Sequence, residues 1–269
     1  MIQLTDDEFN KLVTYIKKSY GIDLSKKRLL IEARMYSVLL QKNVSTFSEY
    51  FKILESSEDE RITLLNKLTT NHTYFMREPR HFEFLKDVIL PRQLQENREH
   101  SLRIWSAGCS TGEEAYTAVM LMKDFFRDKP GWDTRILATD ISTKVLDGAQ
   151  RGAYTDESLK NLPESWKRLY FTKSGETYVL RDEILREVIF RRLNLMDDFH
   201  FQRPFDLIFC RNVMIYFTAD AKENLIRKFY NLLKPGGYLF IGHSENIQRG
   251  AAGFRYVEPS IYQKGQQGT

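Results

Sequence analysis

The residues best suited to chemistry lie at 102–116, where the sequence reads LRIWSAGCSTGEEAY. Apolar residues as far as Trp105 predict a short buried strand, and Gly108 and Gly112 predict a tight turn. From Glu113 onward, apolar residues recur at helical spacing, which predicts a helix. Backbone N–H groups converge where such a loop opens a helix, and small residues let a ligand approach the backbone. This stretch therefore predicts an anion or cofactor site.

The loop is open to three interpretations. Its glycines do not complete the dinucleotide fingerprint G-x-G-x-x-G, whereas residues 108–112 match G-x-S-x-G, the nucleophile elbow of serine hydrolases. The third interpretation is an ordinary strand-to-helix turn without a ligand. Ser110, Asp140 and His243 occur in the order of a hydrolase triad, but no strand is expected before residue 102 to supply half of an oxyanion hole. A cofactor without a pyrophosphate would not need the missing middle glycine, and S-adenosylmethionine is such a cofactor.

Polar residues also follow the other predicted strands. The strand at 135–139 delivers Asp140, whose carboxylate can accept hydrogen bonds from ribose hydroxyls or can cap the next helix. Asn194-Leu195 follow a further strand-like run. The apolar run at 205–210 delivers Arg211-Asn212, with Tyr216 about one helical turn beyond. Ligands of open α/β sheets bind outside the carboxyl ends of the strands, so these residues are candidates for one site.

The segment before the sheet predicts helices only. Thr5–Glu8 and Thr46–Glu49 have the pattern of capping boxes, and Gly21 is expected to end the first helix. The apolar positions of the second helix are Leu29, Ala33, Tyr36 and Leu40. Short helices at this spacing predict a small bundle.

Residues 71–79 then mix polar and aromatic side chains, which favours a binding segment over a mere linker. We expect a helix from Pro79 that Pro91 ends or kinks. From residue 102 onward, strands alternate with helices, which is typical of a parallel sheet. Residues 169–193 interrupt this rhythm with a hairpin at Ser174-Gly175 and a further run, VIFRRL, and predict a small β-subdomain.

The composition fits about two globular domains, with 42% hydrophobic and 28% charged residues among 269. No apolar run is long enough to span a membrane, and the N-terminus lacks a signal-peptide pattern, so we expect a cytoplasmic protein without membrane insertion. Two cysteines are too few for a disulfide framework. The five histidines show no paired ligand spacing, so no metal is expected.

Positive charge is concentrated at residues 11–42, where eight basic residues face two acidic ones and the net charge is +6. This charge run is either a solvated helix face or a docking surface for an acidic partner, protein or nucleic acid. Aromatic residues hardly interleave with the basic ones, which disfavours single-stranded nucleic acid.

Over nearly its whole length the chain resembles the CheR-type chemotaxis-receptor methyltransferases, which are protein-glutamate O-methyltransferases. The segments that carry the resemblance are TTNHTYFMRE at 69–78, SAGCSTGEEAY at 106–116, ATDIS at 138–142, LNL at 193–195, FDLIFCRNVMIYF at 205–217 and LLKPGGYLFIGHSE at 232–245. The stretch LKPGGYLF alone is a general mark of methyltransferase sheets. Its combination with CRNVMIYF and TNHTYFMRE, in this order, is highly specific.

The resemblance implies an α/β fold with a doubly wound, class I methyltransferase-like sheet whose last strand is antiparallel. It implies an all-helical domain at 1–70, a linker and helix at 71–100, and an S-adenosylmethionine-binding domain at 101–269 with the β-subdomain at about 168–193. Some family members use that subdomain to bind a receptor tether through a glycine-rich loop. The single glycine in Lys173-Ser174-Gly175-Glu176 argues against this use here.

The resemblance also implies which residues contact the cofactor. Those expected to contact S-adenosylmethionine, or its product S-adenosylhomocysteine, are Asn71, Thr73, Arg77, Gly108, one of Glu113 and Glu114, Asp140, Asn194, Leu195, Arg211 and Asn212. From the chemistry of the transfer we further expect Arg77 and Tyr216 to orient the acceptor. The alternative for Tyr216 is simple packing beneath a helix, but its position in the family motif favours the functional role. A glutamate carboxylate has an ordinary pKa of about 4.3 and is ionised at neutral pH, so the transfer needs no general base.

The implied partner is the cytoplasmic helical region of methyl-accepting chemotaxis receptors, whose acidic segments suit the basic surface that includes Lys26, Lys27, Arg28 and Arg34. We expect a monomer. Two alternatives stay open: a methyltransferase of this fold with another acceptor, and a non-enzymatic protein that binds the cofactor as a signal.

Overall fold

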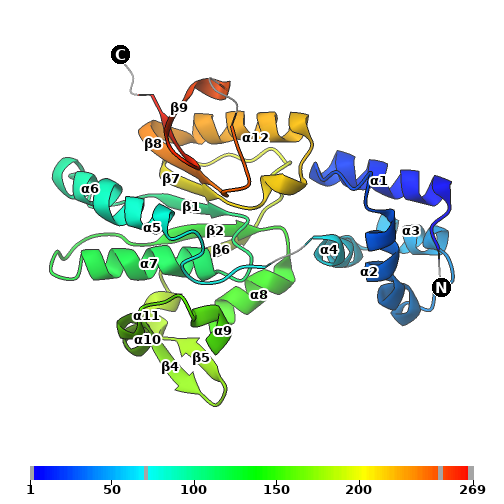
Figure 1. The fold of residues 1–269 in the computed structure, drawn as a ribbon, viewed down its shortest axis with the longest axis horizontal. Coiled ribbons are helices and arrows are strands. Elements are labelled where there is room, and N and C mark those ends of the chain that lie inside the picture. Colours follow the sequence, from blue (N-terminus) through cyan, green and yellow to red (C-terminus); the bar gives the residue numbers. More distant parts are fainter. Residues whose placement is uncertain (1–2, 70–71, 248–250, 266–269) are drawn as a thin grey trace.

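The computed structural model describes residues 3–69, 72–247 and 251–265. A helical bundle lies to one side of a larger domain built on a central sheet (Figure 1). The bundle contains α1 (Asp6–Tyr20), α2 (Arg28–Gln41), α3 (Phe47–Ser56) and α4 (Glu58–Leu68). The first capping box is formed as predicted, because the Thr5 hydroxyl accepts the Glu8 N–H and the Glu8 carboxylate accepts the Thr5 N–H. Gly21 ends α1 in the left-handed conformation.

Helix α2 presents a different face to the bundle core from the one that the sequence favoured. It buries Ile31, Met35, Val38 and Leu39. The apolar positions named from sequence lie outside, with Leu29 80%, Tyr36 39% and Leu40 52% exposed. The helix is apolar on two sides, so periodicity alone could not tell which side its neighbours would cover.

A bent helical segment follows the linker and packs against the sheet. It consists of α5 (Arg80–Phe84), the π-helical turn η1 (Leu85–Ile89) and α6 (Leu90–Glu96). The predicted helix therefore starts beside Pro79 and is interrupted where Pro91 approaches. A proline has no N–H and its ring crowds the carbonyl four residues earlier, which explains the wider turn before it.

The central sheet has seven strands in the order β6-β2-β1-β7-β8-β10-β9, and its last strand, β10, runs antiparallel to both neighbours. This confirms the predicted fold class. The strands are β1 (Ile104–Ala107), β2 (Ile136–Asp140), β6 (Val188–Arg192), β7 (Phe205–Cys210), β8 (Leu233–Ile241), β9 (Phe254–Glu258) and β10 (Ile261–Lys264). Helices α7 (Glu113–Phe125) and α8 (Thr143–Arg151) belong to one hydrophobic core with α5, and α12 (Ala219–Leu232) belongs to another.

The small β-subdomain differs from the prediction in its boundaries. Its sheet has the order β3-β5-β4 and contains β3 (Ala153–Thr155), β4 (Phe171–Ser174) and β5 (Thr177–Leu180). The hairpin at Gly175 is therefore present, but VIFRRL forms β6 and pairs with β2 in the main sheet. The run suits either sheet, and β3 is too short to give a sequence signal. Short helices α9 (Asp156–Leu159), α10 (Glu164–Tyr170) and α11 (Asp182–Leu185) complete this region.

Two short helical turns lie in the C-terminal part of the larger domain: η2 (Met214–Tyr216), which follows β7, and η3 (Ala251–Gly253), which precedes β9. Among the described residues, no helix has both the length and the apolar character needed to cross a membrane.

Candidate active-site cleft

A cleft opens at the carboxyl ends of the central strands, between the larger domain, the linker and the bundle. Chain order reverses across β1, with β2 on one side and β7 on the other, so this is the switch point where α/β folds bind ligands. Most of the residues named from sequence line the cleft: Thr73, Arg77, Gly108, Glu114, Asp140, Asn194, Leu195, Arg211, Asn212 and Tyr216. The bundle adds Tyr20, Ile22, Leu65 and Thr69. Asn71 lies outside the described residues.

The loop of residues 108–112, between β1 and α7, binds the carboxylate of Asp140, which lines the cleft. The Asp140 carboxylate accepts the Ser110 N–H at 2.9 Å and the Ser142 N–H at 3.0 Å. Burial raises its pKa, and these backbone donors oppose the rise. Neither bond involves an imidazole, and the ring of His243 lies beside that of His81, with 5.5 Å between the ring centres, so the geometry gives the serine hydrolase interpretation no support.

Gly108 shows why the loop needs a small residue. Its φ is +83°, and a Cβ there would lie 2.4 Å from Cγ2 of Val213. Any larger residue would displace the segment after β7, which carries Arg211 and Asn212.

The two adjacent glutamates in the first turn of α7 have different surroundings. Glu114 lines the cleft, and its carboxylate accepts the Ser106 hydroxyl at 2.6 Å and Nη1 of Arg211 at 3.0 Å. Glu113 is not among the cleft residues, is 3% exposed and accepts the Thr111 hydroxyl at 2.7 Å. Geometry therefore favours Glu114 over Glu113 as the cofactor contact, a choice that the sequence left open.

A buried ion network joins Glu114 to a residue that the sequence did not suggest, Glu78. Nε and Nη2 of Arg211 donate to one oxygen of Glu78 at 3.2 and 3.1 Å. The side chain of Arg211 is 2% exposed and those of the two glutamates are each 12% exposed. Arg211 Nη2 also donates to the carbonyl of Arg77. Two carboxylates thus surround one guanidinium, and the network carries a net negative charge when all three groups are ionised.

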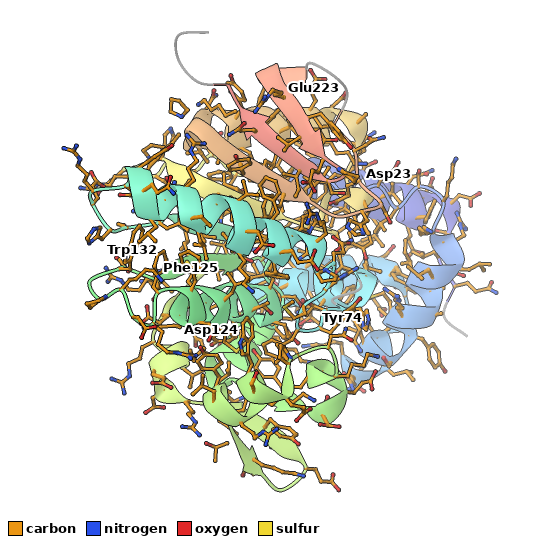
Figure 2. All side chains as sticks on the ribbon, turned by 60° about the vertical axis from the view of Figure 1, so that its left-hand side comes forward. Asp23, Tyr74, Asp124, Phe125, Trp132 and Glu223 are labelled. Atoms are coloured by element: carbon orange, nitrogen blue, oxygen red, sulfur yellow. The ribbon has the colours of Figure 1, made fainter. Side chains whose placement is uncertain are left out.

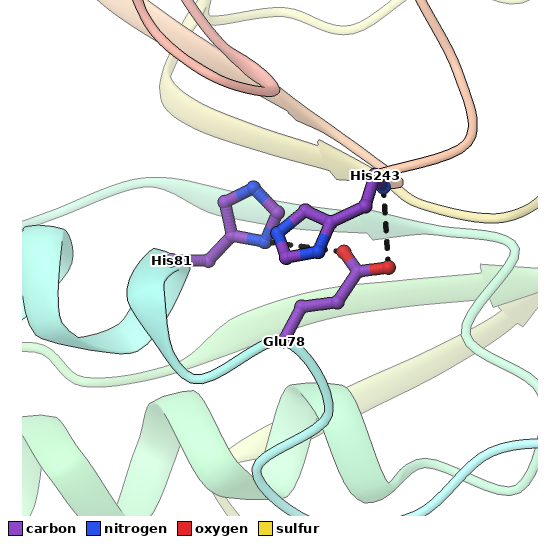
Figure 3. A group of neighbouring side chains, drawn as sticks. All are labelled: Glu78, His81 and His243. Atoms are coloured by element: carbon purple, nitrogen blue, oxygen red, sulfur yellow. Dashed lines mark hydrogen bonds and ion pairs between the residues drawn. The ribbon is translucent and has the colours of Figure 1, made fainter.

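Glu78 connects the linker to the residues that follow β7 and β8, and Figure 3 shows its contact with His243 after β8. Its second oxygen accepts the His243 backbone N–H at 3.2 Å and Nδ2 of Asn212 at 3.4 Å. Burial alone would raise the pKa of Glu78, but the charge of Arg211 and the His243 N–H outweigh it and lower that pKa. Glu78 has a φ of +54°, which sequence does not reveal. The only available signal was an acidic residue within the unusual linker segment.

Glu78, His81 and His243 together resemble a metal-binding group. Their ligand atoms lie within 4.8 Å of one another, and His81 is fully buried. Burial and the Arg211 charge lower the pKa of His81 to about 3, so its ring is neutral. However, both oxygens of Glu78 already accept hydrogen bonds, and the adjacent guanidinium repels a cation. The charge of Arg211 therefore disfavours a metal ion here, although neither ring nitrogen of His81 has a hydrogen-bond partner among the described residues.

Glu245 organises the segment that carries Asn212 and Tyr216, and it too was missed from sequence. Its carboxylate accepts the backbone N–H groups of Gly242 at 2.6 Å, Asn212 at 3.0 Å and Ile215 at 3.1 Å. A carboxylate that receives several backbone donors holds the loop in one conformation.

Arg77 and Tyr216, the proposed acceptor-binding pair, both line the cleft. Nη1 of Arg77 donates to the His72 carbonyl at 2.6 Å, and the guanidinium lies 5.9 Å from the ring centre of Tyr74. Tyr216 packs against the hydrophobic core of the bundle. The two side chains therefore reach one cleft from two segments, the linker and the turn after β7.

Three residues named from sequence have intramolecular partners that change their interpretation. Nδ2 of Asn194 donates to the Ser19 carbonyl at 3.1 Å and so braces α1. Arg28 pairs with Asp6 at 2.5 Å, and Nη1 of Arg34 donates to the Lys67 carbonyl at 3.1 Å. Of the predicted docking residues, Lys26 and Lys27 are the exposed ones.

Two family models match the chain. The model described as "CheR methyltransferase, all-alpha domain" matches residues 7–69, and "CheR methyltransferase, SAM binding domain" matches residues 71–262. The first spans the helical bundle, and the second spans the linker and the central sheet.

Curated relatives are similar over nearly the full chain. A chemotaxis protein methyltransferase from Borreliella burgdorferi is 45% identical over 272 residues, covering 98% of this chain and 96% of the relative. Its counterpart from Escherichia coli is 37% identical, covering 97% and 92%. Chemotaxis protein methyltransferase 2 from Vibrio cholerae is 35% identical, covering 92% and 88%.

Proposed function

Because this chain belongs to the CheR methyltransferase family, we propose that it transfers the methyl group of S-adenosylmethionine to glutamate side chains of chemotaxis receptors. S-adenosylmethionine is its cofactor, and the glutamate acceptor is our proposal. The products are a glutamate methyl ester and S-adenosylhomocysteine. The observation that supports the proposal is that Arg77, Asp140 and Tyr216 all line one cleft at the carboxyl ends of the sheet strands.

The charges of the cleft fit a cofactor that carries sulfonium and ammonium groups. The buried network of Glu78, Glu114 and Arg211 has two carboxylates against one guanidinium, and this excess negative charge favours a cation nearby. We propose that Glu114 contacts the ammonium group and that Asp140 accepts the ribose hydroxyls. Thr73, Gly108, Leu195 and Asn212 line the remaining surface.

When bound, S-adenosylmethionine supplies an electrophilic methyl group on a sulfonium sulfur. The protein must bring an acceptor oxygen into line with the carbon–sulfur bond, and such alignment can lower a barrier by roughly 7–11 kcal/mol. Arg77 grips the acceptor carboxylate with a planar fork of N–H donors. Tyr216, from the turn after β7, contacts the same carboxylate. The acceptor is ionised at neutral pH, so these residues position it without removing a proton.

Helix α2 offers a surface suited to an acidic helical partner. Lys26 and Lys27 are exposed ahead of it, and the exposed positions Leu29, Tyr36 and Leu40 follow one another at helical spacing. A receptor helix with acidic and apolar positions would complement both features. We propose this surface as the receptor-docking site, with the lysines accelerating encounter and the apolar stripe retaining the partner.

The decisive experiment follows radiolabelled S-adenosylmethionine into purified receptor cytoplasmic fragments. We expect base-labile label on the receptor with the wild-type protein. We expect Arg77→Ala and Tyr216→Phe to cut turnover at least about tenfold while the melting temperature changes little. Label that enters another acceptor but not the receptor would refute the glutamate assignment. A variant that methylates receptor at the wild-type rate would exclude the substituted residue from positioning the acceptor.

A further inference from the structure

The loop between α1 and α2 pairs with the backbone around Tyr216. Ile22 and Phe217 form an antiparallel bridge. The Asp23 N–H donates to the Tyr216 carbonyl at 2.8 Å, and the Thr218 N–H donates to the Gly21 carbonyl at 2.9 Å. These contacts join the bundle to the larger domain at the cleft, and Figure 2 labels Asp23 at this boundary. We call residues 21–24 the α1–α2 strap.

Gly21 lets the strap approach closely. Its φ is +69°, and a Cβ at this position would lie 2.6 Å from Sδ of Met196 and 3.0 Å from Cβ of Ala221. The contact therefore depends on a residue without a side chain. Ile22 itself lines the cleft, so the strap forms part of the wall that faces a substrate.

The turn that carries Tyr216 has little structure of its own. It is the three-residue turn η2, and 3₁₀ hydrogen bonds have poorer geometry than those of an α-helix. Glu245 holds its beginning through the Ile215 N–H, whereas the strap holds the Tyr216 carbonyl and the N–H two residues later. The backbone around Tyr216 is thus held by hydrogen bonds from both domains, from Glu245 before the tyrosine and from the strap at and after it.

From these contacts we infer that the α1–α2 strap positions Tyr216 for methyl transfer, so that the bundle is part of the catalytic apparatus as well as a docking module. The inference rests on the proposed role of Tyr216. The strap is one of several links between the domains, since Asn194 binds the Ser19 carbonyl at 3.1 Å and Arg192 pairs with Glu58 at 2.7 Å. Weakening the strap should therefore leave the bundle attached while Tyr216 shifts.

Thr218→Pro tests this with minimal disturbance. Thr218 has a φ of −64° and Phe217 a ψ of 151°, and both suit a proline at 218. Proline removes the N–H that binds Gly21. It also removes the hydroxyl that accepts the Ala221 N–H at 3.3 Å, so Thr218→Ala, which loses only the hydroxyl, is the matched control. We expect the kcat of Thr218→Pro to be roughly tenfold or more lower than that of Thr218→Ala, because small misplacements of groups in a site lower the rate by up to about a hundredfold.

The pattern of effects separates positioning from general stability. We expect the KM for S-adenosylmethionine and the melting temperature of Thr218→Pro to stay close to those of Thr218→Ala. In a Tyr216→Phe background, Thr218→Pro should reduce kcat less than about threefold, because both changes act through one side chain. Full additivity of the two losses would overturn the inference, as would equal kcat values for the proline and alanine variants.

A second pair of variants keeps the test valid if Thr218→Pro does not fold. Gly21→Ala should lower kcat and should couple to Tyr216→Phe in the same way. Gly175→Ala places alanine at another left-handed glycine, with φ +60° and no atom within 4 Å of the added Cβ, and should keep wild-type kcat. If the wild-type protein does not methylate receptor, the proposed function fails and the inference falls with it. An active wild type with additive variants would refute the inference alone.

Discussion

Replacing Glu78 with glutamine tests the ion network beneath the cleft. The substitution keeps the size of the side chain and removes its charge. One oxygen of Glu78 accepts two N–H groups of Arg211, and the other accepts donors from His243 and Asn212. A glutamine must turn its own N–H₂ toward one of these donor pairs. The N–H₂ of the glutamine then points at groups that also donate hydrogen bonds, either those of Arg211 or those of His243 and Asn212. At least one of these buried hydrogen bonds is therefore lost.

The expected loss of stability depends on which ion pairs remain in the Glu78→Gln variant. Breaking a buried ion pair by removing one partner costs about 3–5 kcal/mol, and a hydrogen bond to a charged group contributes about 1.5–3 kcal/mol. Glu114 still pairs with Arg211 at 3.0 Å in the variant, so no charge is left unpaired. We therefore expect a loss near the lower figure, about 2–3 kcal/mol, which corresponds to roughly 4–12 °C in melting temperature for a chain of this size.

Glu258→Gln is the matched control, because Glu258 also accepts two N–H groups from one arginine. Arg80 donates to it at 2.8 and 2.7 Å, but the two side chains are 49% and 29% exposed. Exposed pairs contribute about 0–1 kcal/mol. Thermal unfolding of both variants should show a clearly larger shift for Glu78→Gln. Equal shifts would refute the argument that burial gives the network its strength.

The lowered pKa of Glu78 adds a dependence on pH. A carboxylate whose pKa is depressed in the folded state stabilises the fold above its unfolded value, here 4.5, and loses this effect as the pH falls through the folded value. The stability difference between wild type and Glu78→Gln should therefore stay constant from neutral pH down to about 5 and shrink below it. A difference that grows toward acid would contradict this sign.

Three further predictions address the cofactor and the partner. Glu114→Gln should weaken S-adenosylmethionine binding about tenfold or more in calorimetry, whereas Glu113→Gln should leave affinity nearly unchanged because its side chain is outside the cleft. The cofactor at about a hundred times its Kd should stabilise the wild type by about 2.7 kcal/mol, and Asp140→Asn should reduce that thermal shift; an undiminished shift would exclude the ribose contact. Charge reversal at Lys26 and Lys27 should slow receptor methylation and flatten its salt dependence, whereas Leu29→Ser with Tyr36→Ser should slow it without changing the salt slope; an unaltered salt slope after charge reversal would argue against docking at α2.

The sequence predicted the sheet and most of the cleft because both depend on local patterns. Apolar runs ending in Asp140 and in Arg211-Asn212 place these residues at strand ends, and strand ends of a doubly wound sheet meet in space. The linker residues could be linked to the cleft only through the resemblance. The choice between Glu113 and Glu114 was undetermined, since both occupy the first turn of α7 and only packing separates them.

The sequence-based predictions were wrong where the same residue pattern fits two different structural surroundings. Helix α2 has apolar residues on two sides, and the side named from sequence is the exposed one. The strand β6 alternates as an edge strand of either sheet would, so its membership followed from pairing with β2 rather than from its composition. Arg28 and Arg34 look like free positive charge in the sequence, yet one pairs with Asp6 and the other binds helix-end carbonyls.

The residues that fix the cleft are hard to find from sequence because much of what they bind is backbone. Glu245 accepts three backbone N–H groups, Asp140 accepts two, and the strap binds the backbone around Tyr216 through hydrogen bonds. A transfer that needs alignment and no proton movement depends on such fixed geometry. The short turn η2 takes its second support from the same bundle that carries the proposed docking surface. In the proposed mechanism, a receptor helix that binds α2 and shifts the strap would also move Tyr216, so partner recognition and methyl transfer would share one structural element.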